Sequence, residues 1–346
     1  MPELWLPYGR LEVMAEVRDA QILRVLAPSP RPLEGGLLSG ARCVALLEEG
    51  QGALAALRQA RAGMRAYVPR GAQLARRICE EGGLELAELR WAKASFGGMS
   101  YARPLVEEGC VLINSFRPDP LYGYSSVGAR LLRQEGGVPE GALERLERGP
   151  SLQAAPAEEA ARALAEALQG LEVVEVVEGG AGPLGAFRGG ALEAYLQARR
   201  LLHEAAFFTV DVRPRMVLAS CGGHPWDRDA FEGLAALWNF AGALEQGAQV
   251  VLLCEAAEGL GSPAWEEALL SGPPARGYFK GAEHMALLRW LSGRATVILV
   301  SALPEALARR LGLRSARSLS DALGLLGPRA RFYIVPYAAC TVLSAT

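Results

Sequence analysis

A strand, a glycine-bearing loop, a helix and a second strand follow one another in the last part of the chain. Residues 216–220 form an apolar run typical of a buried parallel strand, and a helical pattern extends over 229–246. A second apolar run, 249–255, leads into another loop with glycines, 256–261. This order predicts a βαβ unit of an open α/β sheet.

The loop after the first of these strands reads Ser220-Cys-Gly-Gly-His-Pro. Ligands of open α/β sheets bind beyond the carboxyl ends of the strands. Glycines let backbone N–H groups approach an anion, and a helix N-terminus favours negative charge. We therefore expect Ser220, Gly222, Gly223 and His224 to bind a phosphate or a carboxylate. The alternative is a tight turn in which an aspartate caps the helix.

A length of 346 residues with 51% hydrophobic residues predicts a globular protein of two domains. We expect an N-terminal α/β domain over 1–205 and a C-terminal α/β domain over 206–346. The predicted fold class is α/β, with two domains, mostly parallel sheets and an interdomain cleft. Strands and helices alternate in both halves. Predicted strands are 42–47, 64–69, 84–89, 109–114, 171–178, 215–220, 250–255, 296–301 and 332–336; predicted helices include 52–62, 71–81, 156–170 and 192–207, and 179–190 is a predicted loop.

Composition excludes several classes of function. No apolar run reaches the length of a bilayer span, and no signal peptide is evident at the start of the sequence. A net charge of −2 is not the footprint of a nucleic-acid-binding protein. We expect a cytoplasmic protein with an anionic small molecule as its partner and with neither nucleic acid nor membrane as a partner. Association into a homo-oligomer is compatible with the sequence.

Cysteine and lysine usage limits the chemistry further. The six cysteines form no CxxC pair, so we expect reduced thiols and no metal site. Lysine occurs only as Lys93 and Lys280, and any lysine-dependent mechanism must use one of these two. The scarcity of asparagine is thermophile-like, although scarce lysine is not.

Several runs resemble one known family. Ala219-Ser-Cys-Gly-Gly-His-Pro-Trp-Asp-Arg-Asp229 and Leu252-Leu-Cys-Glu-Ala-Ala-Glu-Gly-Leu-Gly261 look like the C-terminal domain of the lactate racemase family, the nickel-pincer-nucleotide proteins. Leu6-Pro-Tyr-Gly9 is similar to the start of that family. Residues 109–128 resemble its signature loop, where a histidine precedes a Gly-aromatic-Ser-Gly-Gly stretch. The likeness is strong over 206–346, moderate over 105–130 and thin elsewhere.

The resemblance implies two α/β domains with a cofactor and a substrate between them. A nickel-bearing nucleotide, tethered through a lysine, accepts the α-hydride of a 2-hydroxy acid and returns it to either face. Histidines act as acid and base. The family is therefore one of isomerases (racemases and epimerases).

This chain departs from the family at the reactive positions. The metal-proximal histidine falls on Asp119, and Arg130 stands near the position of the tethering lysine. The Tyr-Gln pair of the second-domain helix falls on Phe231-Glu232. We therefore expect no covalently tethered nickel-pincer nucleotide. Asp119, His224 and Glu232 remain as candidate catalytic residues.

Other candidates come with structural alternatives. A polar loop with Tyr124, Ser125 and Ser126 is predicted to line a ligand, and turn chemistry is the alternative. Cys221 with His224 could form a nucleophile and base, or a buried thiol beside a packed histidine.

Acidic residues follow both strands of the βαβ unit. Asp227, Glu255 and Glu258 could hold a cation or a substrate hydroxyl, or be surface carboxylates. Lys280 is a candidate partner for an anion.

Two functions remain open on the sequence. The first is a divergent lactate-racemase-like protein that binds an anionic small molecule, a hydroxy acid or a nucleotide, with isomerase or epimerase activity. The second is a pseudoenzyme, a non-catalytic descendant that serves as a binding or assembly subunit.

Overall fold

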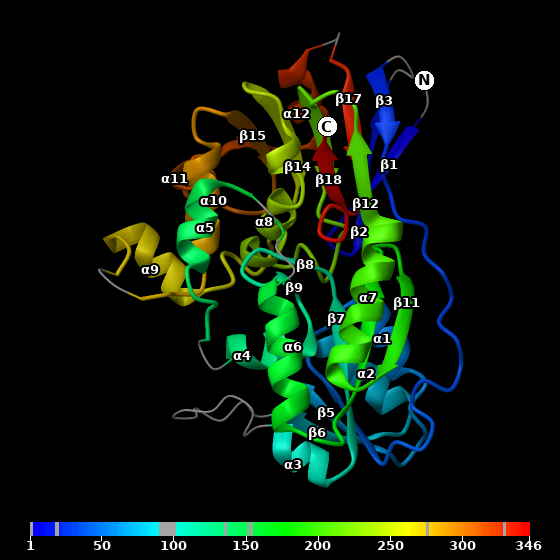
Figure 1. Ribbon diagram of the computed structural model, residues 1–346. Helices are drawn as coiled ribbons and strands as arrows, with labels where there is room; N and C mark the ends of the chain where they lie inside the picture. The colour runs from blue at the N-terminus through cyan, green and yellow to red at the C-terminus, as the bar shows by residue number, and fades with distance from the viewer. Residues whose placement is uncertain are drawn as a thin grey trace. The chain divides into compact units, whose positions relative to one another are not determined.

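The chain passes repeatedly between two structural units of this computed structural model (Figure 1). Unit 1 comprises Met1–Pro28, Gly141–Ser151 and Ala206–Thr346, and unit 2 comprises Ser29–Glu140 and Leu152–Ala205. The structure describes residues 3–17, 21–89, 102–134, 137–150, 152, 155–274, 277–327 and 330–346.

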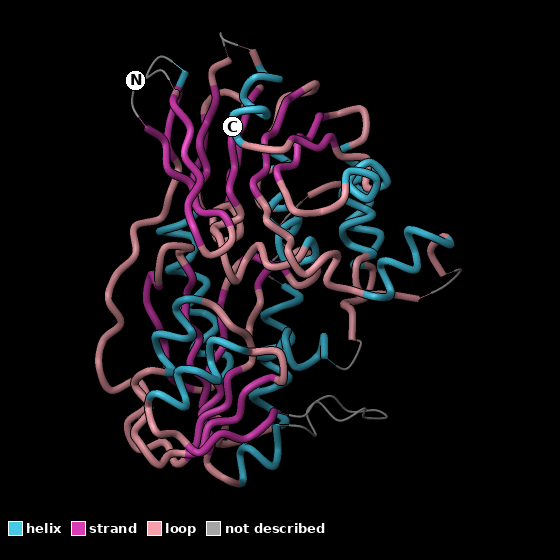
Figure 2. The backbone as a smooth tube through the Cα atoms, turned by 180° about the vertical axis from the view of Figure 1, so that it is seen from behind, coloured by secondary structure: helices cyan, strands magenta, loops and turns pink. Residues whose placement is uncertain are grey.

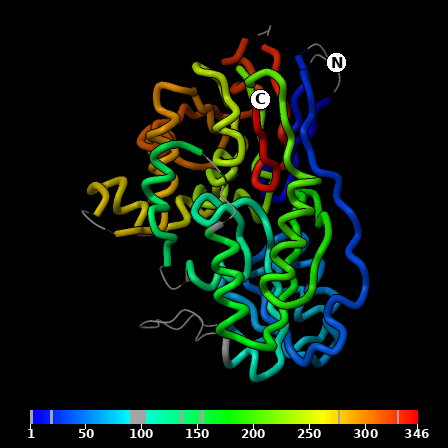
Figure 3. The backbone as a smooth tube through the Cα atoms, viewed as in Figure 1, coloured from blue at the N-terminus to red at the C-terminus, as the bar shows by residue number. Residues whose placement is uncertain are grey.

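The start of the chain belongs to the same unit as its C-terminal part, and not to the N-terminal domain that the sequence predicts. The sequence predicts 1–205 as one domain, and the chain does re-enter unit 1 at Ala206. However, Met1–Pro28 belongs to unit 1. The cause is strand pairing: β3 (Ile22–Val25) pairs in parallel with β17 (Phe332–Val335) near the other end of the chain. Figure 3 shows these blue and red segments side by side.

Unit 2 is built on a six-stranded sheet of order β11-β10-β7-β4-β5-β6. Its neighbouring strands are parallel except for β10 and β11, which are antiparallel. The predicted loop 179–190 is wrong over most of its length, because it contains β11, which completes the edge of the sheet. The strands are β4 (Cys43–Leu46), β5 (Arg65–Pro69), β6 (Glu85–Leu89), β7 (Cys110–Phe116), β10 (Glu172–Glu178) and β11 (Pro183–Gly189).

Helices cover both faces of the unit 2 sheet, as the alternation of side chains in β4 shows. Val44 and Leu46 pack with buried residues of α1 and α2. Cys43 and Ala45 pack on the other face with residues of α4, α6 and α7. This burial of both faces explains why the strands read as continuous apolar runs. The helices are α1 (Gln51–Leu57), α2 (Gln73–Glu81), α3 (Ala102–Glu107), α4 (Val127–Gln134), α6 (Ala155–Ala167) and α7 (Ala191–Ala206).

Unit 1 contains a second six-stranded sheet, of order β16-β15-β14-β13-β17-β3, in which all strands are parallel. The four strands predicted in this region are present, and β16 and β3 extend the sheet at its two edges. The strands are β13 (Met216–Ser220), β14 (Ala248–Leu253), β15 (Ala295–Val300), β16 (Arg314–Ala316), β17 and β3. The two sheets confirm the predicted α/β class with mostly parallel strands.

An antiparallel hairpin, β1 (Glu3–Tyr8) and β2 (Leu11–Glu16), covers part of one face of the unit 1 sheet (Figure 2). Leu6 and Ala15 pack with Leu218 and Val251 of the sheet in one core cluster. The remaining elements of unit 1 are α5 (Ala142–Arg148), α8 (Ala230–Trp238), α9 (Pro263–Ser271), α10 (Ala282–Leu291), α11 (Glu305–Arg310), α12 (Leu319–Leu326), β12 (Phe207–Val210) and β18 (Val342–Ala345). No helix within the described residues is long and apolar enough to cross a membrane.

One cysteine pair differs from the predicted reduced thiols. Cys43 and Cys110 are the first residues of β4 and β7 and form a disulfide. The parallel register places them directly opposite each other, with their Cα atoms 4.4 Å apart. Spacing along the sequence does not reveal such a register, so the expectation was wrong for this pair. Cys79, Cys221, Cys254 and Cys340 are free and buried.

A glycine in α4 tests the packing of unit 2. A Cβ at Gly128 would lie 2.5 Å from the backbone oxygen of Ala160 in α6, so we expect Gly128→Ala to lower the free energy of unfolding by about 1–3 kcal/mol. Gly324 in α12 has open space around it, so Gly324→Ala should be neutral or stabilise by about 1 kcal/mol. Urea unfolding of both variants measures the difference. Equal effects would contradict the close packing of α4 on α6.

Candidate functional site

The tip of the β1–β2 hairpin occupies the glycine loop after β13. His224 donates its backbone N–H to the Gly9 oxygen at 2.6 Å, and Gly9 donates its own N–H to Asp227 Oδ2 at 2.6 Å. The Ser220 hydroxyl donates to the backbone oxygen of Pro7. Protein groups of the hairpin therefore contact the loop where the sequence predicts an anion.

Two more amides of this loop donate to oxygen atoms of the loop itself. Gly222 donates to Ser220 Oγ at 3.0 Å, and Trp226 donates to the Gly223 oxygen at 2.8 Å. Gly223 has a φ of +73°, and a Cβ there would lie 2.9 Å from the Gly9 oxygen. The glycine is thus required for close approach of the hairpin backbone.

Four charged or titratable side chains gather around this loop, and we call them the His224 cluster: His224, Arg10, Arg228 and Glu258. His224 is partly buried, and its pKa is lowered from 6.5 by that burial and by the positive charges of Arg10 and Arg228, with Glu258 opposing them. The imidazole is therefore neutral at pH 7. Arg10 lies in the hairpin turn after Gly9, and the sequence alone gave no reason to place it beside residue 224.

Asp227 lies fully buried beneath the same loop. Its Oδ2 accepts from the Gly9 and Glu255 amides, whereas its Oδ1 has no hydrogen-bond partner among the described residues. Burial raises the pKa of this carboxyl. Burial and the Glu255 carboxylate also raise the pKa of nearby Tyr8 to about 12, so its phenol stays protonated.

The thiol of Cys221 is buried rather than exposed for attack. It donates to the Gly233 oxygen at 3.3 Å, and burial and the Cys254 thiol raise its pKa well above the ordinary value. A thiol held protonated in this way is a poor nucleophile. The geometry favours the structural alternative for Cys221.

Among the remaining predicted residues of unit 1, Lys280 and the backbone amide of Glu232 have partners within the protein. Lys280 Nζ donates to the Gly261 oxygen at 3.2 Å and lies 4.2 Å from the centre of the Phe231 ring. The Glu232 amide donates to Asp229 Oδ1 at 2.8 Å, which makes Asp229 the N-cap of α8. Glu258 is exposed.

The predicted polar loop of unit 2 is buried and internally bonded. Tyr124 Oη contacts His203 Nε2, and Ser125 Oγ donates to the Ser115 oxygen at 2.8 Å. Ser126 Oγ accepts from the Ala129 amide at 3.2 Å, at the start of α4. These contacts are the turn and capping chemistry that the sequence left open as the alternative.

Asp119 belongs to an arginine network that the sequence did not predict. It forms an ion pair with Arg133 at 2.8 Å, and the charges of Arg133, Arg130 and Arg117 outweigh its burial to lower its pKa. Glu48, after β4, pairs with both Arg117 and Arg130. Arg130, which stands near the tethering-lysine position, is thus held by a carboxylate.

Three buried glutamates hold helix N-termini in unit 2. Glu178 accepts from the Gly52 and Ala53 amides of α1 at 2.9 and 3.1 Å, and Glu175 accepts from the Val127 amide of α4 at 2.7 Å. Glu49 accepts from the Ala75 amide of α2 at 2.9 Å. A visible signal was present: glutamates interrupt an otherwise apolar strand in Glu172–Glu178. The positions that favour an anion are filled by the protein's own carboxylates.

Among the residues that the structure describes, one group brings three ligand atoms suited to a metal close together: Cys43, Glu108 and Cys110. The two sulfur atoms are bonded to each other, so they are not thiolate ligands in this state.

The fold of the chain is similar to that of a solved structure. The lactate racemase apoprotein from Thermoanaerobacterium thermosaccharolyticum superposes with a TM-score of 0.68 at 14% identity, over 99% of this chain and 100% of that one. The chain has a lactate-racemase-like fold. A Thermotoga maritima protein matches with a TM-score of 0.47 at 11% identity, over 89% and 95% of the two chains. Neither the family models nor the curated proteins give a match.

The residues of this chain do not fit the tethered cofactor that the resemblance implies. Arg130 pairs with Glu48, and Asp119 pairs with Arg133. Lys280 is held at Gly261 in unit 1, and Lys93 lies outside the described residues. We derive no chemistry through that group.

The contact between hairpin and loop predicts a stability difference. We expect Gly223→Ala to cost about 1–2 kcal/mol for its left-handed backbone and about 1–3 kcal/mol more for displacing Gly9. Gly247→Ala is the matched control, because Gly247 has a φ of +80° and nothing within 4 Å. Urea unfolding should show a clearly larger loss for Gly223→Ala; equal losses would mean that the hairpin does not rest on this loop.

Buried Glu178 predicts a pH dependence of stability. Burial raises its pKa from 4.5 to about 7, so the folded state holds the proton more tightly than the unfolded chain. The contribution of this protonated carboxyl to the free energy of unfolding is complete below about pH 4.5 and is lost as the pH rises through 7. Glu178→Gln should remove on the order of 1–3 kcal/mol of the stability change between pH 5 and 8.

Glu172→Gln is the control, because Glu172 lies exposed on the same strand and pairs with Arg188. Thermal unfolding at several pH values should show the same change of stability with pH for Glu172→Gln as for the unsubstituted protein. A Glu178→Gln slope equal to that of the unsubstituted protein would contradict the assignment.

Proposed function

We propose that unit 1 binds a small carboxylate-bearing molecule of the 2-hydroxy-acid class at the His224 cluster. The single observation behind this proposal is the partly buried neutral imidazole beside two guanidinium groups, after the carboxyl end of β13. Open α/β sheets bind ligands at this edge. The lactate-racemase-like fold agrees with a ligand of this class.

Each part of such a ligand has a chemically suited group. Guanidinium groups bind carboxylates through paired, charge-assisted hydrogen bonds. Arg10 offers one such group, and Arg228 offers a second whose Nε also pairs with Asp229 at 3.3 Å. A neutral imidazole accepts a hydrogen bond from a hydroxyl group. Asp227 Oδ1, buried without a partner among the described residues, is a second acceptor.

A hydroxy acid fits this site better than a nucleotide. Phosphate binding at a glycine loop relies on backbone amides that point at the ligand. Here the amides of Gly222, His224 and Trp226 already donate to protein oxygens. Side chains, rather than the backbone, are therefore the groups that recognise the anion.

Isomerisation by proton transfer is a second candidate function. His224, with its lowered pKa, is the candidate base, and the Asp227 carboxyl, whose pKa burial raises, lies three positions further along the same loop. The rival, a non-catalytic binding or assembly subunit, is supported by the internally bonded side chains of unit 2.

Calorimetry with lactate tests the binding proposal. Arg10→Gln should weaken binding by about 10- to 100-fold, because a hydrogen bond between charged groups contributes about 1.5–3 kcal/mol. Lys280→Gln, which removes a charge at another place in unit 1, should leave the affinity unchanged. The proposal fails if the unsubstituted protein binds neither enantiomer, or if both variants lose affinity equally.

Exchange of the C2 hydrogen of lactate in heavy water distinguishes an isomerase that acts by proton transfer from a binding protein. An isomerase should incorporate deuterium into lactate at a rate that rises with pH through a midpoint below 6.5 and then levels, because the base must be deprotonated. His224→Gln should abolish the exchange while lactate still binds. Binding without exchange at any pH would contradict isomerisation by proton transfer.

A further inference from the structure

The disulfide of unit 2 lies at a surface cavity that the proposed function does not use. Cys43 lines a cavity of about 420 Å³ together with Arg42, Gly63, Arg65, Glu85 and Glu108. A volume of this size is in the range of small-molecule sites. Cys110 is not among the lining residues, so Cys43 is the member of the pair that borders the cavity.

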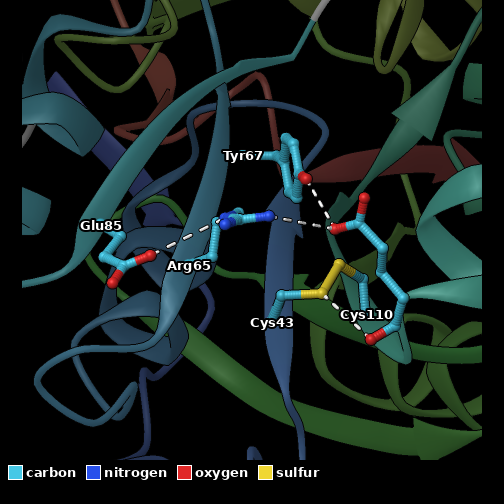
Figure 4. Close-up of a disulfide and its surroundings, with 6 residues drawn as sticks. Cys43, Arg65, Tyr67, Glu85 and Cys110 are labelled. Carbon is cyan, nitrogen blue, oxygen red and sulfur yellow. Dashed lines mark hydrogen bonds and ion pairs between the residues drawn. A yellow bond between two sulfur atoms is a disulfide. The ribbon is translucent and has the colours of Figure 1, made fainter.

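Charged groups surround the disulfide in a defined arrangement (Figure 4). Arg65 pairs with Glu85 and with Glu108, each at 3.8 Å, and Tyr67 Oη donates to Glu108 at 2.6 Å. Arg42 has no ion pair among the described residues, and a Cβ at Gly109 would lie 2.6 Å from its Nε. The Arg42 guanidinium group is therefore available to bind an anionic ligand next to Cys110.

A purely structural cross-link would not need this access. Cys43 and Cys110 already face each other through the ladder of β4 and β7, and both are buried in the core on one side of the sheet. The cavity reaches Cys43 at the first residue of β4, where the chain enters the sheet.

The geometry points to a thiol–disulfide exchange site at Cys43, whose co-substrate is a small thiol carrying carboxylates, of the glutathione class. The thiolate of that molecule attacks Cys43 Sγ, the Cys43–Cys110 bond breaks, and the electron pair leaves with Cys110 Sγ, which takes a proton from water. A second thiolate attacks the mixed disulfide and releases Cys43. The disulfide gains two electrons, and two small thiols are oxidised to their disulfide.

Glutathione is the probe for the test, with peptide mapping after alkylation as the readout. The full-length protein in native buffer should lose the Cys43–Cys110 disulfide, while Cys79, Cys221, Cys254 and Cys340 stay unalkylated. In Cys110→Ser, glutathione disulfide should place one glutathionyl group on Cys43. In Cys43→Ser, Cys110 should remain unmodified.

A charge variant keeps the test valid even where a cysteine variant fails to fold. Arg42→Gln should slow reduction by glutathione about fivefold, since one charge interaction near the surface is worth about 1 kcal/mol. Reduction by 2-mercaptoethanol, whose thiolate carries no carboxylate, should slow less than reduction by glutathione. Reduction only in urea, glutathionylation of Cys110 in preference to Cys43, or an equal effect of Arg42→Gln on both thiols would each overturn the proposal.

Discussion

The structure depends on carboxylates that satisfy helix N-termini from within. In unit 2, Glu178 and Glu175 reach from one strand to the starts of α1 and α4, and Glu49 reaches the start of α2. Each bond satisfies amides that a helix leaves without partners in its first turn. At the carboxyl edge of this sheet, the helix amides that would attract an external anion already bond to the protein's own carboxylates.

In unit 1, backbone groups of the β1–β2 hairpin satisfy the polar groups of the loop after β13. The hairpin tip delivers the Gly9 oxygen to His224 and the Gly9 amide to Asp227. The side chains near a ligand at this loop are a neutral imidazole, Arg10, one buried carboxylate oxygen of Asp227, and Arg228, whose Nε also pairs with Asp229 at 3.3 Å. The two units thus share an α/β plan but differ in what their strand ends offer. The fold is therefore lactate-racemase-like, whereas the side chains at the strand ends are not those that the resembled family uses for its reaction.

Much of the fold could be predicted because buried parallel strands have a strong local pattern. The runs that became β4, β7, β13 and β14 are apolar on both faces, which is the signature of a sheet covered by helices. β11 was missed because its glycines and proline resemble a loop, and only its pairing with β10 makes it a strand. The helix predicted over 229–246 ends at Trp238, since it is followed by a short 3₁₀ turn at Ala241–Ala243.

The site was harder to predict, because it depends on contacts between distant segments. His224 and Asp227 were named from the loop, but the predicted backbone cradle ignored the hairpin that fills it. Arg10 and the partners of Asp119 could not be inferred, since their proximity follows from tertiary packing. The Cys43–Cys110 bond likewise follows from strand register.

The chain contains only three histidines, which makes imidazole NMR the most direct measurement. With labelled histidine, the His224 resonance should titrate below pH 6.5 and should shift when lactate is added, while His203 and His284 stay unchanged with lactate. A His224 signal that ignores lactate, or a shift as large at His203, would contradict the account.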